Sequence, residues 1–182
     1  MQQTLDELTT AIDHIRQSPS DQGTLELIVR RPAVDQREVV EVGELDPDIG
    51  LVGDTWSLRP SSQMPDESPH PDMQLNIMNA RCIDVIAGSR DRWPLAGDQL
   101  YLDLDLSPEN LPAGTRLRIG SGVIEVTDQP HNGCQKFSQR FGVDALRFVN
   151  SELGRSVRAR GINAKVVEGG TIRQGDRVTR LG

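Results

Sequence analysis

A cysteine in a turn is the residue of this sequence whose type and neighbours most clearly suggest chemical reactivity. The stretch "QPHNGCQKF" carries Cys134, and its near neighbours along the chain are His131, Asn132 and Lys136. A strand-like run, "GVIEVT", leads into this stretch, and the proline and glycine within it end regular structure. The sequence therefore predicts that Cys134 lies in a turn beside a lysine and a histidine.

A thiol reacts and binds metals as the thiolate, which nearby positive charge and backbone N–H groups favour. Lys136, and to a lesser degree His131, could supply that environment for Cys134. A soft thiolate suits a soft metal, or sulfur carried as a persulfide. Composition alone leaves the alternative that Cys134 has no chemical role, and that His131 is a hydrogen-bonding residue of the loop rather than a general base.

The rest of the composition narrows the class of protein. The 182 residues fit one domain, and 36% hydrophobic residues can fill one core. Cys82 lies in the apolar run "ARCIDVIAGS" and is expected to be buried. The two cysteines show no zinc-ligand spacing, and a disulfide between them is not expected in a reducing compartment. No apolar run approaches the length of a membrane helix, and the N-terminus does not resemble a secretory signal. We expect a cytoplasmic protein.

Charge is distributed unevenly along the chain. Residues 1–130 hold 10 arginines, no lysine and 23 acidic residues, a balance of -13, whereas residues 131–182 hold 10 basic and 4 acidic residues, a balance of +6. The overall charge of -7 argues against nucleic-acid binding. The basic C-terminal portion is either a solvated imbalance or the binding region of a small anionic ligand.

Hydrophobic periodicity predicts a β-rich, mixed α/β domain. Apolar residues at helical spacing predict an N-terminal amphipathic helix within residues 1–20. Several short strands follow, among them the alternating "QLYLDLDLS", expected to be half-buried, and a hairpin in "TRLRIGSGVIEVTD". The segment "GVDALRFVNSELG" predicts a helix. Residues 57–73 carry four prolines and are expected to form a long exposed loop, either a mobile lid or an insertion.

The order of the C-terminal motifs resembles the MOSC domain family, named for the C-terminal domain of molybdenum cofactor sulfurase. The similarity rests on "LPAGTRLRIGSGVIEVTDQPHNGC", then a helix, then "RGINAKVVEGGTIRQGDRV", with "GLVGDTW" upstream. It covers residues 24–180 and is densest over 111–178. The resemblance implies a β-barrel with a few flanking helices, in a stand-alone member of the family with the Pro-rich loop 57–73.

The resemblance also implies a function for Cys134, either as a ligand of molybdenum in a bound pterin cofactor or as a carrier of persulfide sulfur. The cofactor, molybdopterin, is anionic through its phosphate, which agrees with the basic tail. From charge we predict that Lys136, Arg158, Arg160 and Lys165 bind the phosphate of the cofactor. His131 and Asn132, which lie next to Cys134 in the sequence, are also predicted to bind the cofactor. The first hypothesis is a molybdenum-cofactor protein that reduces N-hydroxylated compounds and needs an electron-donor protein. The alternatives are a sulfur carrier supplied by a desulfurase, and a non-enzymatic adaptor that binds a partner protein.

Overall fold

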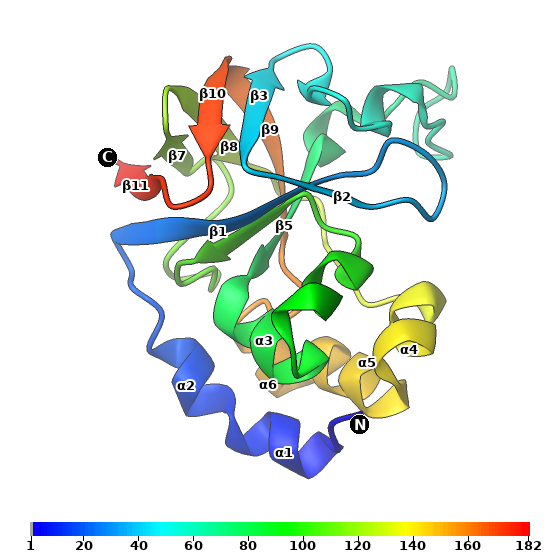
Figure 1. Cartoon of the computed structure of the whole chain (residues 1–182), viewed down its shortest axis with the longest axis vertical. Helices are drawn as coiled ribbons and strands as arrows, with labels where there is room; N and C mark the ends of the chain where they lie inside the picture. The colour runs from blue at the N-terminus through cyan, green and yellow to red at the C-terminus, as the bar shows by residue number, and fades with distance from the viewer. Residues whose placement is uncertain (1) are drawn as a thin grey trace.

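A closed β-barrel forms the centre of the computed structural model, which describes residues 2–182 (Figure 1). Its strands pair in the order β11-β7-β8-β9-β5-β6-β1, and β1 pairs with β11 to close the ring. All pairs are antiparallel except β5–β6. The bounds are β1 Gln22–Arg30, β5 Leu75–Asn79, β6 Leu100–Asp103, β7 Arg116–Ile119, β8 Gly122–Val126, β9 Ile162–Glu168 and β11 Arg177–Leu181. The predicted β-rich barrel is confirmed.

Two smaller pieces of sheet complete the β structure. Strand β2 (Glu38–Val40) pairs antiparallel with the C-terminal end of β1, beyond the segment of β1 that pairs with β11. A separate three-stranded sheet has the order β10-β3-β4, with β10 Gly170–Arg173, β3 Val42–Asp46 and β4 Gly50–Leu51. The β7–β8 hairpin turns at Gly120, whose φ of +54° is a left-handed conformation, as the glycine pair in the sequence predicted. Leucine, isoleucine and valine side chains from all these strands fill the barrel interior.

Helices pack together on one side of the barrel, at the bottom of Figure 1. They are α1 Leu5–Thr10, α2 Ile12–Arg16, α3 Ala80–Ala87, α4 Gln135–Phe141, α5 Val143–Asn150, α6 Glu152–Ser156 and the 3-10 segment η3 Arg90–Ala96. A second hydrophobic core lies between them and the outer face of the barrel. No helix in residues 2–182 is long and apolar enough to cross a membrane.

The N-terminal segment differs in detail from the single helix predicted within residues 1–20. It forms two short helices that meet at Ala11, which is the C-cap of α1 and the N-cap of α2. Leu8, Ile12 and Ile15 are buried against the other helices, as their spacing predicted. The capping box of Thr4 and Glu7 fixes the start of α1.

Strand β6 is buried on both faces, whereas its alternating sequence predicted one exposed face. Leu100 and Leu102 point into the barrel core, and Tyr101 belongs to the helical core on the other side. The Tyr101 hydroxyl donates a hydrogen bond to the carbonyl oxygen of Trp93 in η3, 2.7 Å away. The helical layer therefore covers the face that the sequence pattern assigned to solvent.

The Pro-rich loop 57–73 runs between two 3-10 turns, η1 Trp56–Leu58 and η2 Pro71–Met73. Its C-terminal end is fastened to the barrel. The carbonyl oxygen of Asp72 accepts a hydrogen bond from the Thr127 hydroxyl at 2.7 Å, and the Asp72 carboxylate pairs with Lys165 at 3.0 Å. The suggested function of the loop as a lid stays a prediction.

Candidate functional site

Cys134 lies at the N-terminal end of α4, with its side chain exposed to solvent. The residue before it, Gly133, is held by Asn150 of α5 through two hydrogen bonds, from Gly133 N–H to Oδ1 (3.0 Å) and from Nδ2 to the Gly133 carbonyl (3.2 Å). A Cβ added at Gly133 would approach Val149 Cγ2 to 2.7 Å. Glycine is therefore needed here because α5 packs directly on the turn.

Asn163 of β9 fixes the other end of the same turn. Its Nδ2 donates hydrogen bonds to the carbonyl oxygens of Gln129 (3.1 Å) and Pro130 (3.3 Å). Its Oδ1 accepts from Nδ2 of Asn76 (2.6 Å), whose Oδ1 in turn accepts from Nη1 of Arg31 (2.9 Å). A chain of side-chain hydrogen bonds thus joins the cysteine-bearing turn to Arg31 at the end of β1.

Arg31 is the centre of a buried polar network. Its Nε and Nη2 bind the two carboxylate oxygens of Asp54 at 2.7 and 2.8 Å, and both side chains are almost fully buried. Gln99 joins this network by accepting a hydrogen bond from the backbone N–H of Asn76 at 2.7 Å. Because buried charges are stable only when paired and hydrogen-bonded, this network holds the guanidinium in one position.

A second buried pair lies behind the turn. Arg160 Nη1 contacts both carboxylate oxygens of Asp98, at 2.7 and 2.9 Å, and its guanidinium carbon lies 5.0 Å from the centre of the Phe137 ring. His131 Nδ1 is 3.6 Å from Asp98. Burial lowers the pKa of His131 well below its ordinary value, and the nearby Arg160 lowers that pKa further. Since Arg160 already neutralises Asp98, the carboxylate does little to favour the imidazolium, and His131 is a neutral side chain.

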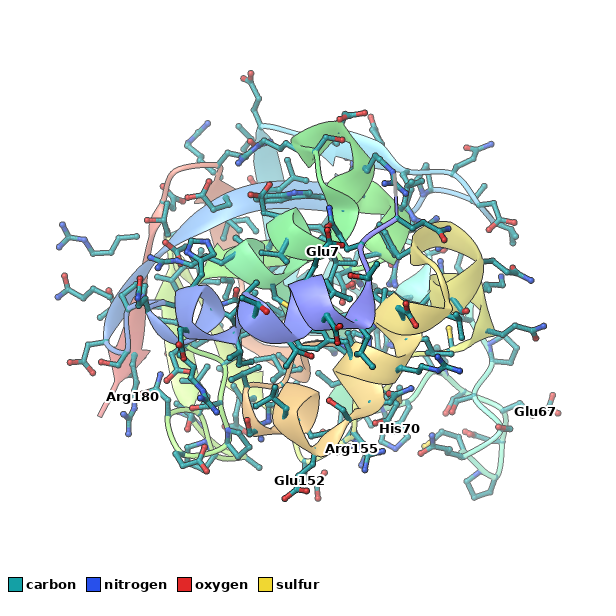
Figure 2. The ribbon with its side chains drawn as sticks, turned by 90° about the horizontal axis from the view of Figure 1, so that it is seen from below. Glu7, Glu67, His70, Glu152, Arg155 and Arg180 are labelled. Atoms are coloured by element: carbon teal, nitrogen blue, oxygen red, sulfur yellow. The ribbon has the colours of Figure 1, made fainter. Side chains whose placement is uncertain are left out.

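A cleft of about 390 Å³ opens beside the turn and is called the turn cleft below. Figure 2 shows one of its residues, Arg155, projecting from α6 at the surface of the helical layer. Four of the six residues predicted to bind the cofactor line it: His131, Asn132, Arg158 and Arg160. The other lining residues are Pro130, Val149, Arg155 and Gly161.

The two remaining predicted residues lie elsewhere. Lys136 is exposed in the first turn of α4, close to Cys134 along the chain. Lys165 points from β9 toward two carboxylates, Asp72 at 3.0 Å and Glu125 at 3.6 Å, and its hydrogen bond to Asp72 raises its pKa. The structure therefore brings four of the predicted residues together, leaves Lys136 exposed two residues after Cys134, and gives Lys165 acidic partners of its own.

Sequence reasoning missed a second cleft, called the arginine pocket below. It has a volume of about 290 Å³ and lies under the Pro-rich loop. Arg31 and Asn76, which connect to the cysteine-bearing turn, form part of its wall. The other lining residues are Trp56, Arg59, Pro60, Ser61, Ser62, Gln63, His70 and Met73.

Two further arginines lie close to the arginine pocket and converge on one short segment. Arg140 Nη1 donates to the carbonyl oxygen of Leu95 at 2.8 Å, and Arg31 Nη1 to that of Gly97 at 3.0 Å. A Cβ added at Gly97 would lie 3.5 Å from Nη2 of Arg37 and 3.7 Å from Nη1 of Arg140. Burial lowers the pKa of Arg37, and the positive charges of Arg140 and Arg31 lower it further. Asp35 pairs with Arg140 at 3.1 Å, so one carboxylate compensates only part of the positive charge of this cluster.

Helix α4 connects this cluster to the thiol. Cys134 caps its N-terminus and Arg140 lies in its last turn. Six residues at the α-helical rise correspond to about 9 Å, a distance that a small organic cofactor can bridge. The four arginines of this region come from three parts of the sequence: Arg31 and Arg37, Arg59, and Arg140. The charge balance of residues 1–130 and 131–182 therefore did not reveal them. The available signal was Arg31 itself, a charged residue that directly follows the apolar run of residues 27–29 and Arg30.

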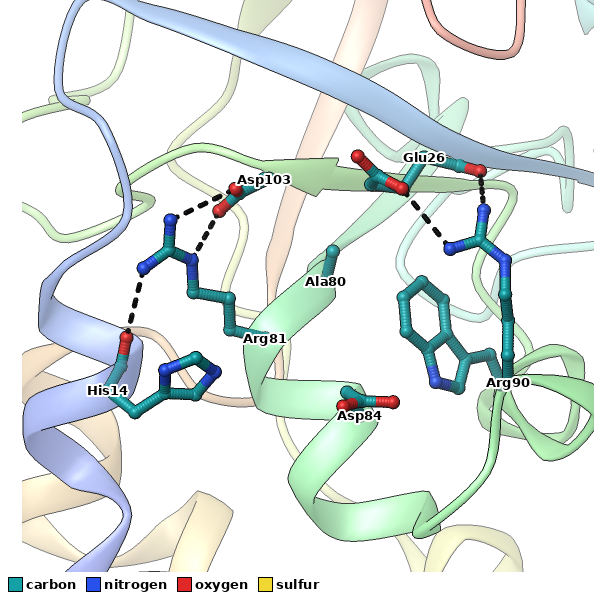
Figure 3. Close-up of a pocket in the computed structure, with 8 residues that line it drawn as sticks. His14, Glu26, Ala80, Arg81, Asp84, Arg90 and Asp103 are labelled. Atoms are coloured by element: carbon teal, nitrogen blue, oxygen red, sulfur yellow. Dashed lines mark hydrogen bonds and ion pairs between the residues drawn. The ribbon is translucent and has the colours of Figure 1, made fainter.

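A third pocket, of about 260 Å³, lies between α2, α3, β1 and β6 (Figure 3). Its charges compensate one another, because Arg81 binds Asp103 at 2.7 Å and Arg90 binds Glu26 at 3.2 Å. None of the residues that line it in the described chain also lines the turn cleft or the arginine pocket. This pocket is therefore separate from the turn cleft and the arginine pocket, and it lies where the helices pack on the barrel.

Comparison with solved structures shows that the fold is shared. The YuaD protein from Bacillus subtilis matches with a TM-score of 0.64 and 15% identity, over 86% of this chain and 94% of that one. YiiM from Escherichia coli matches with a TM-score of 0.56 and 18% identity, over 87% and 70%. YiiM from Geobacillus stearothermophilus matches with a TM-score of 0.57 and 14% identity, over 88% and 75%. No curated protein matches the sequence at a significant level.

The family is shown by the sequence itself. The model of the MOSC domain matches residues 70–179, which is more than half of the chain. The match includes the turn of Cys134, the β7–β8 hairpin, strands β9 and β10 and the first residues of β11. The match includes the motifs from 111 to 178, where the resemblance in the sequence is densest, but not the upstream "GLVGDTW". The chain belongs to the MOSC domain family.

Proposed function

We propose that this protein binds the molybdenum cofactor and that the Cys134 thiolate is its ligand to the metal. The observation that carries the proposal is the position of Cys134, an exposed thiol on a turn that Asn150 and Asn163 fix from two sides. A metal-binding side chain on a fixed turn is preorganised, so cofactor binding costs little conformational entropy. Membership in the MOSC family supports the same proposal.

The donor set fits a metal that arrives with ligands of its own. Within residues 2–182 no three His, Cys, Asp or Glu side chains are grouped to hold a metal ion. Cys134 can add one soft thiolate, which suits a metal already held by the sulfur atoms of a pterin. The exposure of the thiol provides the access that such a bulky group requires.

The arginine pocket suits the phosphate of that cofactor. Arg59 lines it, and Arg37 lies beside Arg31 with its buried Nε without a hydrogen-bond partner among residues 2–182. Guanidinium groups bind phosphate through paired N–H donors, and an added anion would relieve their mutual repulsion. Lys136 and Asn132, which flank Cys134, would contact the cofactor near the metal. Phosphate-binding roles for Arg158, Arg160 and Lys165 stay predictions.

The chemistry proposed is the reduction of N-hydroxylated compounds. When bound, molybdenum would supply the redox chemistry, with electrons from a separate donor protein. The chain itself would hold the cofactor by Cys134 and its phosphate by Arg37 and Arg59. Asn150, Asn163 and the buried pair behind the turn would keep the thiol in place.

Cofactor content tests the assignment of the arginine pocket. The chain, expressed in a host that makes molybdenum cofactor, is compared with Arg59→Gln, Arg37→Gln and the control Arg180→Gln, which alters an arginine on β11. We expect the first two variants to lose most of their pterin, measured as its fluorescent oxidation product, and the control to keep it. Unchanged pterin in both pocket variants would contradict this assignment.

Transfer of persulfide sulfur is the second candidate, because the exposed Cys134 is accessible to a partner protein. A desulfurase and cysteine would then add the mass of one sulfur atom to Cys134 in metal-free protein, measured by intact mass spectrometry. The absence of this increment, in a protein that binds molybdenum, would exclude the sulfur-carrier function.

A further inference from the structure

We propose that the turn cleft is a binding site for a small organic carboxylate and holds the acidic end of the substrate. This inference rests on the proposed function, because it places the reducible end of that substrate at a cofactor bound by Cys134. The cleft combines three arginines with an apolar wall, at the side of the turn that carries the thiol.

Two of the three arginines of the cleft have no acidic partner. Arg160 is neutralised by Asp98, but within residues 2–182 no carboxylate lies at ion-pairing distance from Arg155 or Arg158. Arg158 Nη1 bonds the main-chain carbonyl oxygens of Leu111 (2.7 Å) and Leu106 (3.3 Å), which leaves its other donors available. The cleft therefore has an excess of positive charge that an anion would compensate.

Buried polar atoms of the cleft also lack partners. Arg160 Nε and His131 Nδ1 are inaccessible to solvent and form no hydrogen bond in the part of the chain that the structure describes. The Arg160 side chain is 9% exposed and that of His131 12%. Unsatisfied groups of this kind are uncommon in native structures and call for a functional explanation. Both residues line the cleft, so these unsatisfied groups lie in its wall.

The backbone holds Arg158 in an unusual conformation. Its φ of +46° lies in the left-handed region, which arginine seldom adopts. Hydrogen bonds on either side of it enforce this conformation, from Ala159 N–H to the Gly154 carbonyl (2.8 Å) and from Gly161 N–H to the Arg158 carbonyl (2.7 Å). Strained residues held by their surroundings cluster at binding sites. Here the turn directs a guanidinium to the edge of the cleft.

The other walls define the class of ligand. Val149, Pro130 and Gly161 give an apolar surface, and the volume of about 390 Å³ suits a small organic molecule. Arg155 and Arg158, neither of which pairs with a carboxylate in residues 2–182, have planar guanidinium groups whose paired N–H donors match the planar shape of a carboxylate. Asn132 lines the same cleft and precedes Cys134 by two residues, so a ligand there would extend toward the thiol.

Calorimetric titration of the metal-free chain tests the site. The probes are phenylacetate, its neutral analogue phenylacetamide, and phenyl phosphate. We expect phenylacetate to bind about tenfold more tightly than the amide, the effect of charge-assisted hydrogen bonds. Equal binding of acid and amide would overturn the proposal, and tighter binding of phenyl phosphate would overturn the assignment to carboxylates.

Matched variants locate the binding. Arg155→Gln changes an exposed residue and should weaken phenylacetate about tenfold, whereas Arg147→Gln, on the neighbouring helix α5, should not change it. Arg158→Gln gives a second measurement of the same loss. Unchanged affinity in Arg155→Gln and Arg158→Gln would overturn the site. Because the protein is metal-free, the result does not depend on molybdenum content, so failure of this site and failure of cofactor binding are seen in separate measurements.

Discussion

Arg31 and Asp54 form a buried bidentate pair that supports both the arginine pocket and the turn of Cys134. Their contacts are 2.7 and 2.8 Å, and the exposed fractions of the side chains are 5% and 0%. The same arginine reaches the cysteine-bearing turn through Asn76 and Asn163. The pair thus connects the stability of the fold to the geometry of the candidate site.

Removal of one partner should be costly. Asp54→Ala leaves Arg31 buried without a counter-charge, and we expect the free energy of unfolding to fall by about 3–5 kcal/mol. The control is the neighbouring surface pair Arg30–Glu38, at 2.9 Å, where Glu38→Ala should cost less than about 1 kcal/mol. Urea unfolding of both variants measures the difference, and equal losses would contradict the importance of the buried pair.

His131 should make stability dependent on pH. Its pKa in the folded chain lies well below the ordinary 6.5 that it regains on unfolding. Below pH 6.5 the unfolded chain therefore binds the proton first, and stability contributed by the neutral side chain is lost as pH falls, at up to about 1.4 kcal/mol per pH unit. His131→Gln should show a flatter thermal-melting profile between pH 7 and pH 5. Parallel profiles for the two proteins would contradict the burial of a neutral histidine.

Gly161 has to be glycine for two reasons. Its φ is +106°, and an added Cβ would lie 2.0 Å from the carbonyl oxygen of Ile77 in β5. Gly161→Ala should therefore unfold the protein or displace the turn that carries Arg158 and Arg160. Gly175→Ala is the control, because Gly175 has a φ of +89° but open space around it, and should cost only about 1–2 kcal/mol. Similar melting temperatures for the two variants would contradict the close approach to β5.

The two cysteines should differ sharply in reactivity. Cys134 is exposed, whereas burial raises the pKa of Cys82 to about 12 and its thiol contacts the Ala159 carbonyl at 3.2 Å. Iodoacetamide at neutral pH should therefore label one site on the native chain and none on Cys134→Ala. Intact mass spectrometry counts the labels, and rapid labelling of Cys82 in the native protein would contradict the packing of the helical core.

Local sequence signals predicted the barrel well. The glycine pair between two alternating runs predicted the β7–β8 hairpin, and the ordered motifs from 111 to 178 predicted the family. Helix α4 was missed, although Phe137 and Phe141 are spaced by four residues and both are buried on one face. The proline and glycine before Cys134 concealed a helix that begins directly after it.

The arginine pocket depends on contacts that no local pattern contains. Arg37, Arg59 and Arg140 become neighbours only because α4 packs near the loops that follow β1 and β4. Similarly, apolar and polar residues alternate in the sequence around β6, which is typical of a half-buried strand. Tyr101 is nevertheless buried, because η3 packs against it. Both features depend on packing between segments distant in sequence, which hydrophobic periodicity does not predict.

Molybdenum content tests the central claim most directly. The chain is produced in a host that makes molybdenum cofactor and is analysed by metal mass spectrometry, beside Cys134→Ala and the control Cys82→Ala. Near-stoichiometric molybdenum in the wild-type chain and in Cys82→Ala, together with its loss in Cys134→Ala, is the result predicted. Molybdenum that is absent from the folded wild-type chain, or that persists in folded Cys134→Ala, would contradict a cofactor bound through this thiolate.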